Sequence, residues 1–228
     1  MGVRILHTSD LHLTRGRRRA LLRFDEPFDL WVDTGDFLPN FGRQPSTHFT
    51  IEPSREVSYQ ARWAELANLG NRIADWLAGR PVLSVPGNHC FYTLADLMRR
   101  IGYLSVFEAS PEGGEVFGVR VAGFREVPFE EGEWPGEVAE PVLEELSRRA
   151  LASAPQLLVT HAPPAGLLDD ARDHVGIPGL LDAIESAAAP PSLHLFGHVH
   201  ATGGQSRRRG ATHFVNGATR MQVLEFEP

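Results

Sequence analysis

Side chains that commonly bind metal ions follow several short apolar runs, at the points where those runs end. Asp10-Leu11-His12 follows the run Val3–His7, and residues i and i+2 of an extended backbone point to the same side. Four later runs end in the same way. Because ligands gather at the carboxyl ends of strands in α/β sheets, we expect these five points to converge. The candidate metal ligands are Asp10, His12, Asp36, Asn88, His161, His198 and His200.

The types of these side chains indicate which metals the site would bind. Four imidazoles, two carboxylates and one amide oxygen, with no thiolate, suit Mn²⁺, Fe or Zn²⁺ at a catalytic site better than a closed structural zinc site. Seven ligands are too many for one ion but suit two ions that share a carboxylate. Two ions about 3.5–4 Å apart activate a bridging water and stabilise both oxygens of an in-line displacement. The pattern therefore predicts a dinuclear hydrolytic centre.

The apolar pattern predicts strands that alternate with helices. Apolar residues recur close to a 3.6-residue period in one long segment, and Thr93 with Asp96 resembles a capping box that opens another helix. We expect helices at Ser58–Leu77, Thr93–Arg100, Val138–Ala152 and Gly179–Ala188. We expect strands at Val3–His7, Leu30–Thr34, Val82–Val85, Val116–Phe124, Leu157–Thr160, Leu193–Phe196, His213–Asn216 and Gln222–Phe226.

The order of these elements predicts a mixed α/β sandwich. The first half alternates strand and helix as parallel layers do, whereas Glu115–Phe124 looks antiparallel because it follows the turn signal Gly113-Gly114. Phe41–Pro53 has no clear periodicity, so we expect a surface loop there. Glu126–Glu145 is strongly acidic and contains Pro and Gly, so we expect an exposed connection.

Length and composition limit the kind of protein. The 228 residues, 42% hydrophobic and 22% charged, suit one globular domain over residues 1–228. The chain has no apolar run of about 18 residues and starts without a signal-peptide pattern, so we expect a cytoplasmic protein without a membrane span. The net charge of −7 gives no support for a protein that coats nucleic acid. The sequence contains no lysine, so all 22 basic residues are arginine.

These motifs together resemble the calcineurin-like metallophosphoesterase superfamily. The likeness runs from Asp10 to His200, and it is carried by Asp-x-His, Gly-Asp, Gly-Asn-His, a single His and Gly-His-x-His in that order. It implies a four-layer αββα fold, with two mixed sheets flanked by helices. It also implies hydrolysis of phosphate esters by in-line attack of a metal-bridging hydroxide.

The resemblance also implies a role for each motif residue. By analogy, Asp36 would bridge the two metals. His89 matches a family histidine that contacts the substrate phosphate and protonates the leaving oxygen. The first metal would be held by Asp10, His12 and His200, and the second by Asn88, His161 and His198.

Two positions depart from the family pattern. Cys90 follows Gly-Asn-His where members usually have Asp or Glu, a change that could alter the orientation of Asn88 or His89. We interpret Cys90 as a buried, inert thiol rather than a reactive one. The second is the segment Phe37-Leu38-Pro39-Asn40 after Asp36. Many members have a polar or acidic residue four positions after the Asp, and Asn40 fills that place only in part.

Other residues have weaker claims to chemistry. We expect His7 and His194 to be core residues, Asn216 to be a turn residue and His174 to lie on the surface. His48 could approach a substrate. Arg15 with Arg17–Arg19, and Arg207–Arg209, could steer an anion, although such runs are usually solvated. We expect the tryptophans Trp31, Trp63 and Trp76 to be packed and Trp134 to be the most exposed of the four.

The substrate is less well defined than the reaction. Thr160–Gly166, Phe196–His200 and Thr212–Ala218 are similar to a branch of small phosphodiesterases that includes cyclic-nucleotide hydrolases, which favours a small phosphodiester. Ile5–Leu13 also resembles the start of DNA-repair nucleases, but Asp36 lacks the Phe-His element of that group. A third alternative is a catalytically inactive protein-binding scaffold. The presence of every expected metal ligand argues against it.

Overall fold

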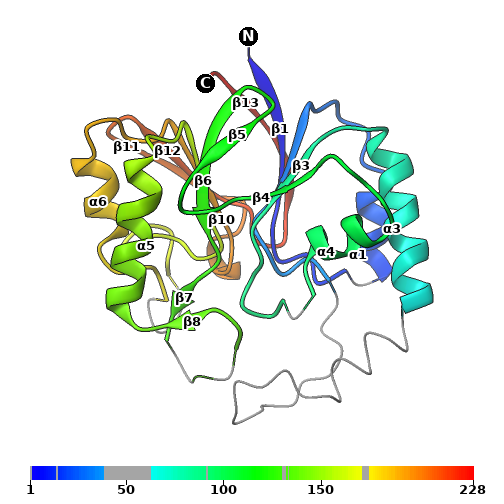
Figure 1. Ribbon diagram of the computed structural model, residues 1–228, viewed down its shortest axis with the longest axis horizontal. Helices are drawn as coiled ribbons and strands as arrows, with labels where there is room; N and C mark the ends of the chain where they lie inside the picture. Colours follow the sequence, from blue (N-terminus) through cyan, green and yellow to red (C-terminus); the bar gives the residue numbers. More distant parts are fainter. Residues whose placement is uncertain are drawn as a thin grey trace.

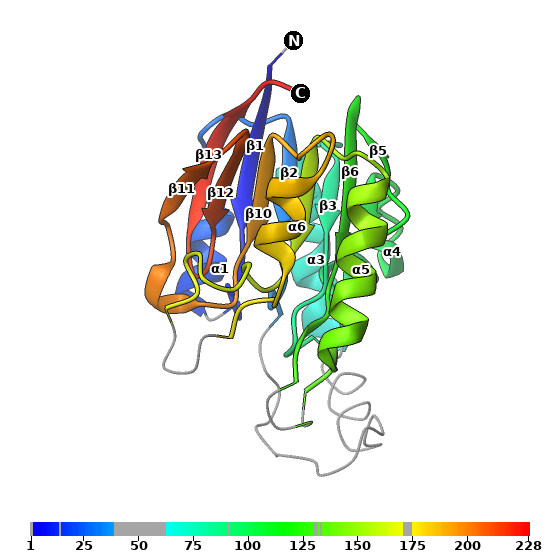
Figure 2. The same ribbon diagram turned by 90° about the vertical axis from the view of Figure 1, so that its left-hand side faces the viewer.

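The computed structural model of the chain describes residues 2–13, 15–38, 63–90, 92–129, 132, 134–170 and 175–228. In these residues two large sheets lie face to face, and helices cover the outer side of each (Figures 1 and 2). The fold is therefore the mixed α/β sandwich of two flanked sheets that the sequence and its family resemblance predicted.

The first sheet contains the first three metal-ligand motifs. Its strands are β1 (Val3–Thr8), β2 (Leu30–Asp33), β3 (Val82–Ser84), β4 (Val106–Glu108) and β13 (Met221–Phe226). They lie in the order β13-β1-β2-β3-β4. β1 to β4 are parallel, whereas β13 runs antiparallel to β1. Every residue of β2 and β3 is buried, as expected of parallel strands that are covered on both faces.

The second sheet contains the last two motifs. Its strands are β5 (Gly114–Val116), β6 (Val119–Phe124), β9 (Leu157–Thr160), β10 (Leu193–Phe196), β11 (Ser206–Arg209) and β12 (Thr212–Asn216). They lie in the order β11-β12-β10-β9-β6-β5, with the inner four strands parallel and both edge strands antiparallel. Two short strands, β7 (Val127–Pro128) and β8 (Glu137–Val138), pair separately.

Three apolar clusters hold these layers together. Between the sheets, side chains such as Ile5, Val32 and Leu195 form one buried cluster. A second lies beneath α1 (Arg15–Leu21), α3 (Trp63–Leu77) and α4 (Leu94–Arg100), and a third beneath α5 (Glu140–Ala152) and α6 (Leu180–Ser186). Burial of apolar surface on both faces of both sheets is the main force that fixes the strand ends in place.

Most of the expected elements are present, with shifted ends. Leu157–Thr160 and Leu193–Phe196 are confirmed as predicted, and the capping box of Thr93 and Asp96 is formed in both directions. The prediction of one strand at Val116–Phe124 was wrong. Phe117 and Gly118, with φ of 54° and 76°, form a turn that separates β5 from β6.

Three further differences concern segments that the sequence described only in part. Glu126–Glu145 is not wholly a connection, because it includes β7, β8 and the start of α5 at Glu140. The arginine-rich segments after the first and last motifs form α1 and β11, which the apolar pattern could not show. The expected loop Phe41–Pro53, residues 58–62 of the expected helix Ser58–Leu77, and His48 and His174 lie outside the described residues.

In the described part of the chain, no helix is long and apolar enough to cross a membrane.

Candidate metal centre

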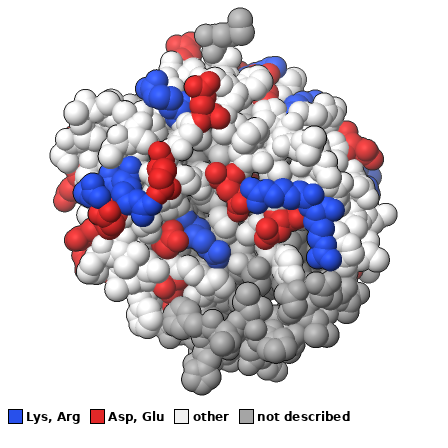
Figure 3. Space-filling view, in the orientation of Figure 1, with Lys and Arg blue, Asp and Glu red and all other residues white. Residues whose placement is uncertain are grey.

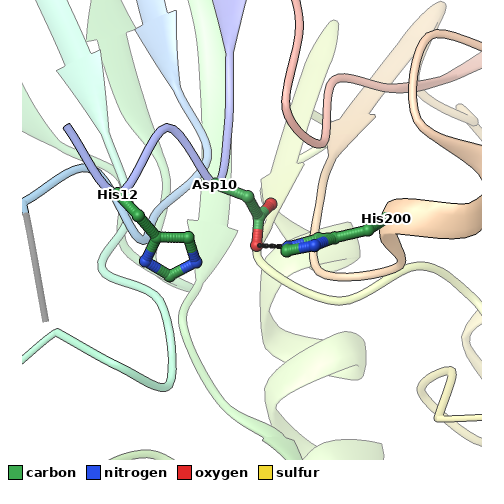
Figure 4. Close-up of side chains that lie close together, drawn as sticks. All are labelled: Asp10, His12 and His200. Atoms are coloured by element: carbon green, nitrogen blue, oxygen red, sulfur yellow. Dashed lines mark hydrogen bonds and ion pairs between the residues drawn. The ribbon is translucent and has the colours of Figure 1, made fainter. Parts of the chain in front are cut away.

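The carboxylate of Asp10 lies at the centre of the first group of candidate ligands. Its Oδ1 is 3.2 Å from His200 Nε2, and its Oδ2 accepts hydrogen bonds from Ser9 Oγ at 2.6 Å and from the His198 backbone N–H at 2.8 Å. Figure 4 shows the His200 ring pointing to Asp10 from one side, with His12 on the other. Ligand atoms of Asp10, His12 and His200 lie within 4.8 Å of one another.

The carboxylate of Asp36 faces three imidazoles. Its Oδ2 is 4.0 Å from His12 Nε2, 4.0 Å from His89 Nε2 and 3.7 Å from His161 Nε2. This oxygen is buried, and no hydrogen-bond donor reaches it within the described residues. A buried carboxylate oxygen without a donor is costly unless a cation satisfies it. Its position between His12 and His161 is the one that a shared ligand would need.

The Nε2 atom of His161 faces the side-chain oxygen of Asn88, which is also a hydrogen-bond acceptor. Its Nδ1 lies 2.7 Å from the backbone carbonyl of Thr34, which can only accept, so Nδ1 carries the proton. In the neutral ring Nε2 is then unprotonated, yet it lies 3.0 Å from the side-chain oxygen of Asn88. Two acceptors at this distance repel each other unless a cation lies beside both. A carbonyl that fixes the other ring nitrogen is the usual support of a metal-binding histidine.

The backbone N–H of His198 donates a hydrogen bond to Asp10, and the His198 ring packs against that of His161. Its ring centroid is 5.0 Å from that of His161, with the rings close to perpendicular. His198 is not in either group of clustered ligand atoms, which are Asp10 with His12 and His200, and Asp10 with Asp36 and His161. Asp10 thus belongs to both groups, a feature that the sequence did not indicate.

The backbone is strained at four of the seven candidate ligands. Asp10, His12, Asp36 and His198 have φ of 52°, 40°, 53° and 66°, the left-handed region that non-glycine residues rarely adopt. Such residues cost about 1–3 kcal/mol each and gather at functional sites. The strained backbone at these loops directs the four side chains toward the candidate metal centre.

Two glycines allow the loops to approach these carboxylates. A Cβ at Gly87 would overlap the Asp36 carboxylate, and one at Gly197 would overlap Ser9 Oγ and the Asp10 carboxylate. The glycine that precedes Asn88 and the glycine that precedes His198 are therefore required by close packing around the two acids.

Burial keeps most of the imidazoles neutral. It lowers the pKa of His198 to about 3, and it lowers the pKa of His12 and His89 in spite of the nearby Asp36 charge. His200 is the exception, because its hydrogen bond to Asp10 raises its pKa. Burial opposes ionisation of Asp10, but His200, His161 and Ser9 outweigh it and lower the pKa of Asp10. Unprotonated imidazoles and ionised carboxylates are the forms that bind metal ions.

Two arginines hold the ligand loops in place. Arg17 Nη1 donates to the carbonyl oxygens of Asp10 and Leu11 at 3.0 and 2.9 Å. Arg125 Nη2 donates to the carbonyl oxygens of Gly87 and Cys90 at 3.1 and 3.2 Å. The sequence places Arg17 among arginines that could steer an anion, and it does not point to Arg125. The available signal was that Arg125 follows β6, a parallel strand whose carboxyl end lies at the same edge as that of β9.

Trp134 also reaches the centre. We expected Trp134 to be the most exposed of the four tryptophans, but its side chain is only partly exposed. Its ring centroid is 4.0 Å from that of His89. Nothing in the sequence placed the acidic segment against this histidine.

His7, His194 and Asn216 have structural roles. His7 and His194 are fully buried core residues, as expected, and they contact Thr34 and Thr160 respectively. The side-chain NH₂ of Asn216 donates to the Val199 carbonyl, and its oxygen accepts from the Ala218 N–H, so it fixes the turn after β12. The interpretation of Asn216 as a turn residue is confirmed.

The family model for calcineurin-like phosphoesterases matches residues 3–202. The chain belongs to this family. Calcineurin-like phosphoesterases hydrolyse phosphate esters with bound divalent metal ions, and this chain is accordingly a metal-dependent phosphoesterase. Its donor set fits such ions, because Asp36 Oδ2 has no donor and His161 Nε2 faces an acceptor.

A solved structure of another protein has a similar fold. It aligns with a TM-score of 0.63 and 16% sequence identity over 100% of this phosphoesterase and 99% of its own chain. Another is a Thermus thermophilus sulfate thiohydrolase SoxB in complex with glycerol. It has 16% identity and a TM-score of 0.41 over 95% of this chain and 41% of its own. No curated protein sequence matches the chain.

Proposed function

We propose that this phosphoesterase holds two divalent ions and hydrolyses a small phosphodiester of the cyclic-nucleotide type. One ion would be bound by Asp10, His12 and His200, and the other by Asn88, His161 and His198, with Asp36 shared between them. The position of Asp36 Oδ2, 4.0 Å from His12 Nε2 and 3.7 Å from His161 Nε2, is the observation that carries this assignment.

The chain's own residues would prepare the site before substrate arrives. When bound, the two ions supply Lewis-acid polarisation of the phosphate and lower the pKa of water. Asp36 Oδ1 accepts the backbone N–H of His89 at 2.9 Å, so the shared carboxylate also fixes the residue that would contact the phosphate. Trp134 packs on the His89 ring and would hold its Nε2 toward the substrate.

Three segments that resemble small phosphodiesterases meet next to this site, which supports the choice of a diester. Thr160 Oγ1 donates to the carbonyl of Ala162, in the segment that contains His161. The Gly197 N–H donates to the His161 carbonyl, and the Gly217 N–H donates to the Phe196 carbonyl. The segments Thr160–Gly166, Phe196–His200 and Thr212–Ala218 thus form one wall beside the ligands.

A substrate panel with an inactive variant tests the proposal. The protein loaded with Mn²⁺, Fe or Zn²⁺ would be assayed against *p*-nitrophenyl phosphate, bis(*p*-nitrophenyl) phosphate, cyclic nucleotides and single-stranded DNA. We expect the highest kcat/KM on a small diester. Asp36→Asn should be inactive, whereas His213→Gln, on β12 away from the ligands, should match the wild type.

The other results would overturn defined parts of the proposal. A rate on DNA alone would favour the nuclease reading, which rests on the Ile5–Leu13 likeness. A rate on monoesters alone would exclude the diester but keep the two-metal site. No rate on any substrate, together with failure to bind metal, would favour a protein-binding scaffold.

Two broader expectations stay proposals. We infer that residues 1–228 form one domain, because β13 pairs with β1 and the two sheets share the apolar cluster between them. Cooperative unfolding in a single transition would support this, and two separate transitions would contradict it. The cytoplasmic location stays a prediction, which cell fractionation tests.

A further inference from the structure

Four arginines line a cavity of about 430 Å³ beside α1 and α3. Arg18 and Arg19 come from α1, Arg23 from the turn that follows it, and Arg72 from α3. Among the described residues Leu22 is the only other one that lines the cavity, so no described carboxylate or aromatic ring lines it. None of the candidate metal ligands lines it either, so the cavity is separate from the metal centre.

The grouping of these arginines is mildly unfavourable without an anion. Arg19 and Arg23 are four residues apart, a spacing at which like charges on helical turns repel each other. Arg18 is partly neutralised by Glu65, whose carboxylate lies 3.5 Å from its Nη1. Within the described residues, Arg19, Arg23 and Arg72 form no ion pair with a carboxylate.

Several arginines elsewhere on the described surface have acidic partners. Arg99 pairs with Glu108, Arg148 with Glu145, and Arg209 with Glu185. Figure 3 shows the same mixing of basic and acidic side chains on one face of the molecule. The cavity beside α1 differs from these pairs, because among the described residues three of its four arginines have no carboxylate beside them.

We propose that this cavity binds the diphosphate or triphosphate group of a small molecule. Guanidinium groups bind phosphate oxygens in pairs of parallel hydrogen bonds, and four of them balance the charge of linked phosphates better than that of one phosphate. The volume lies within the range of small-molecule sites. A nucleic acid strand is a poorer match, because single-stranded binding sites add aromatic side chains on which bases stack, and no described aromatic residue lines this cavity.

The site has a direct connection to the catalytic loop. Arg17, between the metal-ligand motif and the cavity arginines, donates to the carbonyls of Asp10 and Leu11 from the same short helix. An anion that orders α1 would therefore act on the backbone that presents Asp10 and His12. The inference does not depend on which phosphate ester the metal centre hydrolyses.

Calorimetry with inorganic triphosphate tests the site. The full chain would be titrated in its metal-loaded form and again after removal of metal, alongside pyrophosphate and inorganic phosphate as shorter probes. We expect triphosphate to bind at the cavity in both forms, more tightly than phosphate and more weakly as salt rises. Removal of Arg19 and Arg23 together by Arg19→Ala and Arg23→Ala should weaken binding by about 10-fold or more.

A charge-matched control separates the cavity from general attraction. Arg207→Ala with Arg208→Ala removes the same two charges from β11, where every residue is exposed, and should leave triphosphate binding unchanged. Equal binding by the wild type and the Arg19/Arg23 double variant would overturn the proposal. So would equal loss in both double variants, equal affinity for phosphate and triphosphate, or binding of single-stranded DNA without triphosphate. Circular dichroism would confirm that each variant is folded, and Arg23→Glu provides a second test by charge reversal.

Discussion

The thiol of Cys90 lies 3.5 Å from Oδ1 of Asp36, the same oxygen that accepts the backbone N–H of His89. Where relatives usually have an acid after Gly-Asn-His, this chain thus has a weak donor directed at the carboxylate that would be shared by two metals. An acid in this place would add a negative charge beside Asp36. The thiol adds none, and it supports the orientation of Asp36 instead.

Cys90 should be chemically inert in the folded protein. It is 6% exposed, and burial together with the Asp36 charge raises the pKa of its thiol. Because the thiolate is the reactive form, Ellman's reagent at pH 8 should react with no thiol in the native state and with one per chain in denaturant. Fast labelling of native protein would contradict the burial of this side chain.

Asp36→Asn should remove the charge that both metals would share. We expect the variant to lose affinity for both ions and to lose at least about 100-fold in kcat. Substitution of a residue that only supports a metal ligand typically costs about 10–100-fold. Metal content by mass spectrometry, beside kcat, measures the two effects separately. Near-normal turnover with two bound ions would remove Asp36 from the shared position.

His89→Ala should separate catalysis from metal binding. If His89 contacts the phosphate and protonates the leaving oxygen, the variant keeps both ions but loses about 10²–10⁴-fold in kcat. Substrates with a leaving group that needs no proton, such as *p*-nitrophenolate, should be affected least. Loss of an ion in this variant would make His89 a ligand.

Arg17→Ala should weaken metal binding rather than anion steering. Without the guanidinium, the carbonyls of Asp10 and Leu11 lose their shared donor, and removal of such a support typically costs about 10–100-fold in metal affinity. Arg17→Lys should recover part of that loss, since lysine donates but lacks the planar fork.

The matched control for Arg17 is Arg19→Ala, which removes the same charge from the same helix. It should leave metal affinity unchanged. If Arg17→Ala alters only the salt dependence of KM and not metal affinity, Arg17 is a steering residue after all.

Acid should destabilise the protein through its buried histidines. Burial lowers the pKa of His7 and of His194 to about 3, whereas an unfolded chain titrates near the ordinary value of 6.5. Between these values the unfolded state binds more protons, so the free energy of unfolding is highest above pH 6.5 and falls as pH decreases toward 3.

His194→Gln should reduce that pH dependence, because glutamine keeps a polar partner for Thr160 without titrating. We expect the slope of unfolding free energy against pH to fall by up to about 1.4 kcal/mol per pH unit in this window. Urea titrations of both proteins from pH 4 to pH 8 measure it. Parallel curves would show that His194 does not titrate with folding.

Much of the fold and the candidate site followed from local sequence signals. Strand ends with Asp, Asn or His predicted which residues would meet, because the apolar runs before them are short and bounded. The β5–β6 turn was missed because Phe117, an exposed aromatic residue, reads as part of a strand. The helix α1 was missed because its arginines show no apolar face.

Contacts between distant segments could not be predicted in this way. Arg125 holds the loop at Gly87 and Cys90 across 38 and 35 residues of sequence, and Trp134 reaches His89 from the segment between β7 and β8. Each depends on how the two sheets are placed against each other. That placement comes from burial in the cluster between them, which no local pattern encodes.

The antiparallel pairing of β13 with β1 has a consequence for the order of folding. Residues Val3 and Phe226 are opposite each other, so the strand that leads to Asp10 has both of its neighbours only when the last strand has been made. Figure 2 shows the two ends of the described chain side by side. During synthesis, one edge of β1 would stay unpaired until β13 emerges from the ribosome. Completion of the Asp10 loop, and with it metal capture, is therefore expected only after β13 has been made and has paired with β1.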